Sequence, residues 1–169
     1  MVTALSVLFL CASCSKSDNE KEEKGGNIVG TWEYHGAVLA AKGVGFIQFD
    51  KDGNCYSLLD EVEVRGDEYW TDGWCELPYY KASYTVNGNS LTINCVELFD
   101  TDDVPDGYVP KKKSITFTYS VQGNSLIVSG GDYGYFPSFL FKMSGTLTKS
   151  NITISDYVKN KEAYLKTIF

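Results

Sequence analysis

Residues 84–93 are YTVNGNSLTI and residues 119–128 are YSVQGNSLIV, so one short pattern occurs twice in this chain of 169 residues. In both copies apolar and polar side chains alternate on either side of a glycine-centred turn, and a period of two predicts strands with one buried face. Asn87 and Gly88 are residue types that adopt the positive φ angles of a tight hairpin turn. Two copies are too few for a solenoid or a propeller. The repeat therefore predicts two successive hairpins of one antiparallel meander.

The same alternation occurs elsewhere in the chain. Residues 50–54, DKDGN, form a further turn sequence, and a bulge is expected at Gly145. Outside the repeat, the expected strands span residues 31–38, 44–49, 55–59, 138–148 and 152–154. About eight to ten strands at these turn spacings are typical of an all-β sandwich or barrel. Consecutive hairpins favour up-and-down order over Greek-key crossings.

A short helix is expected after the strands. Tyr157, Tyr164, Leu165 and Ile168 have helical spacing within residues 155–169. One apolar face at this spacing predicts a helix that packs on the barrel wall.

Composition is that of a single folded domain. A chain with 43% hydrophobic residues can bury one sizeable core, and no linker separates two folded parts. The net charge of -7 argues against a nucleic-acid partner. The lysines at 111–113 are interpreted as a solvated strand edge rather than a binding patch.

The N-terminal residues differ from the rest of the chain. Residues 2–10 form an apolar run that is too short to span a bilayer and suits the core of a signal peptide. The run ends in LCASC, and small residues before a cysteine resemble the lipobox of bacterial lipoproteins. This resemblance implies a lipoprotein signal segment at residues 1–14, with Cys14 lipidated as the mature N-terminus; an ordinary secretory signal is the alternative. Residues 15–27 predict a flexible tether, and they resemble the acidic tether of surface-exposed lipoproteins of the Bacteroides group.

The predicted folded domain, residues 28–169, opens with the sequence IVGTW. Gly30 and Trp32 form a Gly-x-Trp motif that resembles the opening motif of lipocalins and their relatives. Together with the DKDGN hairpin and the repeated hairpins, it resembles the lipocalin-like domains of Bacteroides lipoproteins over about residues 28–155. The resemblance implies a small up-and-down antiparallel barrel in which Trp32 packs across the closed end.

Lipocalins also stack a late arginine on this tryptophan. Arg65 is the only arginine of the chain, so no late arginine is present. Lys142 or Lys149 is the expected substitute, although a lysine lacks the planar guanidinium.

The residue types of common catalytic sites are scarce. His35 is the only histidine, and no Gly-x-Ser-x-Gly elbow is present. His35 is interpreted as a strand residue that faces solvent or the mouth of a cavity. Residues 50–61 have acidic side chains at the spacing of an EF-hand, but Cys55 stands where that loop requires glycine, so a hairpin is predicted. We therefore expect a protein that is not an enzyme and that uses no metal or cofactor.

The cysteines suggest an exported protein. Alternation places Cys95 on a buried strand face, where it is expected to act as a small hydrophobic residue. Cys55 and Cys75 are then the predicted disulfide pair in an oxidising compartment.

Two aromatic segments, residues 68–80 and 130–137, depart from simple alternation. Binding sites often lie in such loops, and exposed rings beside Asp and Asn can stack on sugars or contact a protein. The alternative is a lid that plugs one end of the barrel. With Trp32, the candidate ligand-binding residues are Tyr69, Trp70, Trp74, Tyr79, Tyr133, Tyr135 and Phe136.

Two classes of function are left open. The first is an exported, lipid-anchored binding protein that takes a small apolar or amphipathic ligand inside the barrel. The second is a surface module whose aromatic loops bind a glycan or a partner protein around a filled interior. Phe117, Tyr119, Phe141 and Met143 are large inward residues, and a barrel of about eight strands is only just wide enough for one small ligand. The expected location is the bacterial cell envelope, as an outer-membrane lipoprotein exposed at the surface.

Replacing Cys14 with alanine tests the lipid anchor. Without its acyl chains the protein should move from the membrane fraction to the soluble fraction, as followed by fractionation and immunoblotting. One acyl chain binds a bilayer weakly and reversibly, so stable anchoring requires the full acyl modification. A Cys14→Ala variant that partitions like the wild type would contradict the lipobox interpretation.

Overall fold

The computed structural model describes residues 25–38, 41–66, 68–73, 80–97, 111–132, 135–136, 141 and 145–169. The strands in these ranges are β1 (Gly30–Val38), β2 (Ala41–Phe49), β3 (Asn54–Arg65), β4 (Glu68–Gly73), β5 (Tyr80–Asn87), β6 (Ser90–Glu97), β7 (Lys112–Gln122), β8 (Ser125–Ser129), β9 (Tyr135–Phe136) and β10 (Thr146–Lys149). Two short helices follow, α2 (Ile154–Lys159) and α3 (Lys161–Ile168).

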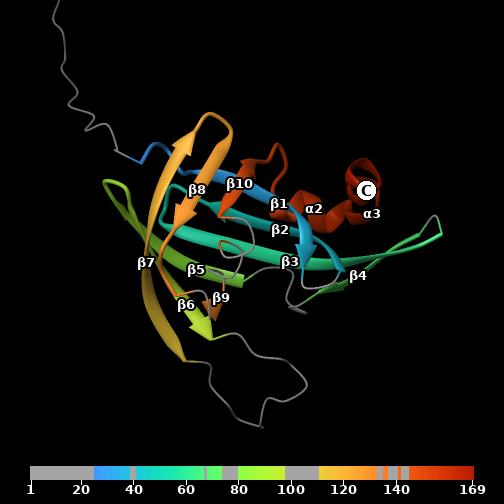
Figure 1. Cartoon of the computed structure of the whole chain (residues 1–169), viewed down its shortest axis with the longest axis horizontal. Coiled ribbons are helices and arrows are strands. Elements are labelled where there is room, and N and C mark those ends of the chain that lie inside the picture. Colours follow the sequence, from blue (N-terminus) through green and yellow to red (C-terminus); the bar gives the residue numbers. More distant parts are fainter. Residues whose placement is uncertain are drawn as a thin grey trace, which may run out of the picture.

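The strands form a closed antiparallel barrel. Its wall runs β1-β2-β3-β5-β6-β7-β8-β10, and β10 pairs with β1 to complete the circle. β4 continues the sheet beyond β3, and β9 pairs with the end of β6. Figure 1 shows the barrel with α2 and α3 outside it and the β3–β4 hairpin projecting beyond the wall. The predicted all-β, up-and-down barrel is confirmed.

The repeated sequence forms the two hairpins that it predicts. β5 and β6 pair from Tyr84↔Ile93 to Asn87↔Ser90, and β7 and β8 pair through Tyr119↔Val128. Gly88 adopts a φ of 62°, the left-handed conformation that favours glycine. Two similar turn sequences, Asn-Gly-Asn and Gln-Gly-Asn, thus produce two neighbouring hairpins of one wall.

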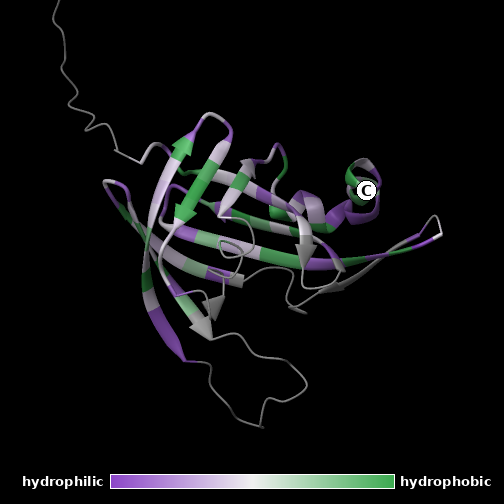
Figure 2. Cartoon of the chain, viewed as in Figure 1, coloured by the Kyte–Doolittle hydropathy of each residue, from purple (hydrophilic) through white to green (hydrophobic). Residues whose placement is uncertain are grey.

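The barrel interior is an apolar core. Alternate residues of the wall strands face inward, and the hydropathy of the strands changes accordingly along their length (Figure 2). The largest buried side chains of this inner cluster are Trp32, Phe49, Phe117, Tyr119 and Phe141. The expectation that Phe117, Tyr119 and Phe141 lie inside is confirmed, whereas Met143 lies outside the described residues.

Trp32 and Lys149 close one end of the barrel, here called the Trp32 end. The Trp32 Nε1 donates a hydrogen bond to the Ile28 carbonyl at 2.7 Å. The Lys149 Nζ lies 4.5 Å from the centroid of the Trp32 ring and donates to the Val29 carbonyl at 2.7 Å. A cation over an aromatic face is attracted by the ring quadrupole. Lys149 therefore takes the position predicted for it, and Lys142 lies outside the described residues.

The position of Lys149 over the Trp32 ring also explains why residue 30 is a glycine. Its φ is 129°, and a side chain at this position would collide with the Lys149 ammonium. The chain before it also crosses the Trp32 end, because the Tyr119 hydroxyl donates to the Gly26 carbonyl at 3.1 Å. Glycine thus allows both the turn into β1 and the approach of the lysine.

The C-terminal segment is helical, but its start differs from the prediction. Residues 152–154 were expected to be a strand, and instead Thr153 is the N-cap of α2. The Thr153 Oγ1 accepts a hydrogen bond from the Asp156 backbone N–H at 3.1 Å, and the Asp156 carboxylate accepts one from the Thr153 N–H at 3.2 Å. This capping box satisfies two backbone donors of the helix. It therefore favours a helix start here over the strand that the alternating Ile152 and Ile154 predicted. No helix in the described part of the chain is long and apolar enough to cross a membrane.

The helices cover the outer faces of β2 and β3. Val44, Phe46, Leu58 and Val62 point outward on these strands and form a second apolar cluster with Ile154, Tyr157 and Leu165. The Phe46 and Tyr157 ring centroids are 4.7 Å apart. Because their inner faces also line the barrel core, β2 and β3 are buried on both sides.

Asp60 lies under the helices and is only 3% exposed. It accepts a hydrogen bond from the Tyr157 hydroxyl at 2.8 Å, and the Lys161 Nζ lies 2.9 Å away. Burial, and then the Asp60 charge, raises the pKa of Tyr157 far above its usual range. A buried carboxylate needs such partners, since an unpaired one would carry a large desolvation cost.

Replacing Tyr157 with phenylalanine should destabilise the fold by about 1–2 kcal/mol, because the buried Asp60 carboxylate loses a charge-assisted hydrogen bond. Urea unfolding followed by circular dichroism measures the change. Tyr164→Phe is the matched control: its hydroxyl binds the partly exposed Glu33, so the loss should be smaller. Equal losses in the two variants would contradict a special contribution of the Asp60 hydrogen bond.

Candidate functional site

The strand order gives the barrel two different ends. The turns at residues 50–53, 88–89 and 123–124 lie at the Trp32 end, where β1 begins and β10 finishes. The opposite end, here called the loop end, is where β1, β6 and β8 finish and where β2, β5, β7 and β10 begin. The long connections between β4 and β5, β6 and β7, and β8 and β10 all belong to the loop end. Ligand sites of barrels favour such an end.

The predicted aromatic residues are distributed over this end. Tyr69 and Trp70 lie on β4, where their backbones pair with Val64 and Glu63. Residues 68–73 are thus a strand rather than the expected loop, because β3 continues to Arg65 and returns through a tight hairpin. This hairpin projects beyond the barrel (Figure 1).

The second aromatic segment reaches the loop end by another route. The backbones of Tyr135 and Phe136 form β9 and pair with Glu97 and Val96 of β6. Of the remaining candidates, Trp32 is buried at the opposite end. Trp74, Tyr79 and Tyr133 lie outside the described residues. The structure therefore places β4 and β9 at the loop end, and binding by their side chains stays a prediction.

Side-chain size changes along the inner wall. The Trp32 end is filled by Trp32, Phe49, Tyr119 and other large residues. Small residues occupy inward positions of β2, β5 and β6 towards the loop end, and of β3 in its first half, next to the turn at residues 50–53. These buried small residues are Gly43, Gly45, Cys55, Ser57, Ala82 and Cys95. In the sequence, both glycines and Ser57 alternate with outward residues that the helices cover. This alternation identifies the three as inward residues only once the inner face of the barrel is known.

Ser57 is the polar member of this small-residue wall. It is 0% exposed, and its Oγ has no hydrogen-bond partner among the described residues. Its neighbours in register are Ile47 and Tyr80, on β2 and β5. A buried hydroxyl without a partner costs about 1–3 kcal/mol and is rare in native proteins. Such a group pointing into the barrel is available to a ligand.

Two thiols flank Ala82 on the same wall. Cys55 pairs in register with Ala82, and burial, followed by the proximity of Cys95, raises the pKa of Cys55 to about 12. The Cys95 thiol donates to the Ile93 carbonyl at 3.6 Å. Cys55 is a free thiol in the structure, in contrast to the predicted disulfide with Cys75, which itself lies outside the described residues. At neutral pH Cys55 is therefore a protonated, apolar wall residue.

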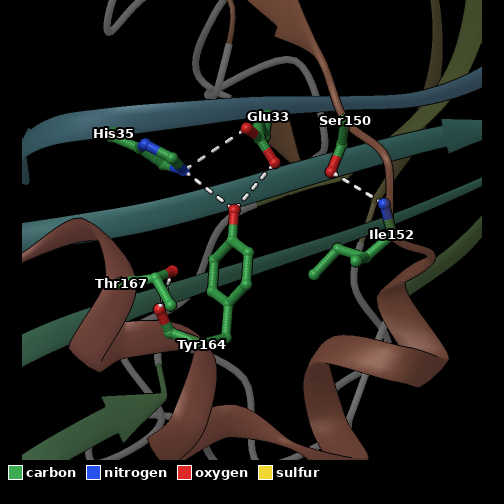
Figure 3. A network of polar contacts seen from close by, with 6 residues as sticks. All are labelled: Glu33, His35, Ser150, Ile152, Tyr164 and Thr167. Carbon is green, nitrogen blue, oxygen red and sulfur yellow. Dashed lines mark hydrogen bonds and ion pairs between the residues drawn. The ribbon is translucent and has the colours of Figure 1, made fainter.

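His35 belongs to a separate polar cluster on the outside of the barrel (Figure 3). The Tyr164 hydroxyl donates to the Glu33 carboxylate at 2.8 Å and lies 3.1 Å from the His35 Nε2. The His35 Nε2 also lies 3.7 Å from Glu33. Burial, and then the hydrogen bond to Glu33, raises the pKa of Tyr164. The cluster joins α3 to β1, and its residues serve helix docking.

Comparison of the chain with protein-family models, curated proteins and solved structures finds no match in any of the three. The candidate site is therefore defined by its own geometry, as the small-residue wall and the unpartnered Ser57 hydroxyl on the inner face of the barrel.

Replacing Ser57 with alanine should leave the free energy of unfolding unchanged or raise it by about 1 kcal/mol, because a buried hydroxyl without a partner is removed. Ser150→Ala is the matched control, since the buried Ser150 Oγ accepts a hydrogen bond from the Ile152 N–H at 3.3 Å and its loss should destabilise the fold. Urea unfolding compares the two variants. A Ser57→Ala variant that is less stable than the Ser150→Ala variant would show that the Ser57 hydroxyl has a structural partner.

Proposed function

We propose that the protein is an exported, lipid-anchored binding protein with a lipocalin-like barrel that takes a small apolar or amphipathic ligand at the loop end. The observation that carries the proposal is the Ser57 hydroxyl, which is fully buried, points inward and has no partner among the described residues. Ligand sites of this kind combine an apolar lining with a few polar groups that orient the ligand.

The small side chains of the inner wall support a ligand site inside the barrel. A barrel of about eight strands with large inward residues throughout would be filled by its own side chains. Here Gly43, Gly45 and Ala82 add little side-chain volume to the inner wall, next to the large Phe117 and Phe141 side chains. A ligand at the loop end would contact these residues and the buried Cys55 and Cys95 side chains.

The lipid anchor proposed at Cys14 is compatible with this arrangement. The described chain begins at Gly25, which is buried against the Tyr119 ring at the Trp32 end. A tether of residues 15–24 spans at most about 35 Å when fully extended. The anchor would therefore hold the Trp32 end towards the outer membrane of a bacterial cell and leave the loop end facing away from it.

A ligand titration with a filled-barrel variant tests the proposal. The indole fluorescence of Trp70 and Trp74 should change saturably with fatty acids or sterols, with micromolar affinity, since buried apolar area contributes about 25 cal/mol per Å² before ordering costs. Gly45→Leu should abolish this response because the new side chain occupies the inner wall. Gly45 lies between Val44 and Phe46 in a strand and is absent from the glycines with positive φ, so leucine is compatible with its backbone.

Ser120→Leu is the matched control. Ser120 alternates with the inward Tyr119 and therefore faces outward, so the same added volume should leave binding unchanged. Circular dichroism checks that both variants fold. If Gly45→Leu does not fold, Gly45→Ala takes its place in the titration. A response to host and plant glycans alone, lost in Trp70→Ala or Trp74→Ala, would overturn the proposal in favour of a surface module that binds glycans or partner proteins.

A further inference from the structure

The barrel wall opens between β5 and β6 near the loop end. Their register extends from Asn87↔Ser90 to Tyr84↔Ile93, and no further pair between these two described strands follows. Before Tyr84, β5 pairs only with β3, while the end of β6 pairs with β9 at Val96↔Phe136. Figure 1 shows β5 and β6 diverging there, with β9 between them. Residues 80–83 of β5 therefore pair with β3, and residues 84–87 pair with β6.

A pocket of about 470 Å³ lies at this divergence. Asn54, Ser83 and Asn94 line it from the outward faces of three strands. Ala82 and Cys95, whose side chains belong to the inner core cluster, also line it. The pocket therefore touches residues of both faces of the wall. Its inner lining is continuous with the small-residue wall, since Ala82 pairs with Cys55, one inward position from Ser57.

Two lysines flank the pocket. Lys81 and Lys112 are exposed, and neither forms an ion pair with a carboxylate of the described residues. The Lys81 Nζ lies 5.7 Å from the centroid of the Tyr56 ring. Hydrogen bonds from Asn54 and, as a smaller cause, the charge of Lys81 lower the pKa of the Asp50 carboxylate. The two lysines thus make one positively charged rim in a chain of net charge -7.

The neutral polar groups of the pocket are already engaged with one another. The Asn94 amide donates to the Ser83 hydroxyl across the divergence, and the Ser114 hydroxyl donates to the Asn94 Oδ1 at 2.6 Å. The Asn54 amide donates to the Asp50 carboxylate at 2.9 Å. The ammonium groups of Lys81 and Lys112 are then the donors available to a ligand, and ammonium donors favour carboxylate or phosphate oxygens.

We propose that this opening is the entry and head-group site for an amphiphile with an anionic head and an apolar tail. Lys81 and Lys112 bind the head, here a carboxylate, and the tail passes Ala82 and Cys95 to reach the Ser57 region of the interior. This inference rests on the proposed binding function and specifies its ligand class. The head-group charge stays at the solvated rim, where its desolvation cost is low, and the tail is buried.

Calorimetric titration with a matched pair of ligands tests the inference. Decanoate and decanol carry the same alkyl chain and differ in the charge of the head. The full chain should bind decanoate about tenfold more tightly than decanol at low ionic strength, since hydrogen bonds to charged groups are the stronger ones. The double variant Lys81→Gln/Lys112→Gln should bring decanoate to the affinity of decanol and leave decanol unchanged.

The control variant removes the same charge elsewhere. Lys51→Gln/Lys159→Gln neutralises two exposed lysines, in the turn after β2 and in α2, and should leave the preference for decanoate intact. A loss of the preference in this control would assign it to net charge and overturn the inference.

Two further outcomes separate this inference from the proposed function. If decanoate and decanol bind equally well and the lysine substitutions change nothing, the barrel binds ligands but the head-group site is wrong. If neither ligand binds saturably, the binding function itself fails, and the head-group site fails with it.

Discussion

The ladder between β2 and β3, paired from Lys42↔Val62 to Phe49↔Cys55, closes the barrel on one side and is covered by protein on both faces. Its inner face joins the core through Ile47 and Leu59, and its outer face holds α2 and α3. Residues of a strand buried on both faces must be apolar or paired. That constraint accounts for the hydrogen bond and ion pair at Asp60, and the unpaired Ser57 hydroxyl on β3 departs from it.

How much could be predicted from sequence depended on the range of the interactions. The hairpins followed from alternation and Asn-Gly turns, which act within ten residues. β4 was missed because its pairing depends on the length of β3, and the start of α2 was missed because a capping box at Thr153 competes with alternation. Ser57, Lys81 and Lys112 could not be assigned to a site, because their proximity arises from the register of β3, β5, β6 and β7.

The Trp32 end is held by a lysine that lies over an aromatic ring. A lysine is a point charge on a flexible stem, without the planar stacking surface of arginine. Lys149 compensates by lying over the Trp32 ring while its ammonium donates to the Val29 carbonyl, and burial lowers the pKa of Lys149. The arrangement requires Gly30, which leaves room for the ammonium. Gly30, Trp32 and Lys149 are therefore one packing unit, and this supports the proposed lipocalin-like character.

The proposed binding site lies away from the Trp32 end of the barrel. The hairpin turns and the incoming chain at Gly25 lie at the Trp32 end, where Trp32, Phe49 and Tyr119 pack. The loop end carries the divergence of β5 and β6, and the Ser57 hydroxyl lies further inside the barrel. A ligand at that end would contribute the contacts that the wall lacks. Under the proposed function, the stability of the fold would be largely independent of the ligand, and a lipid anchor before Gly25 would leave the proposed entry site free.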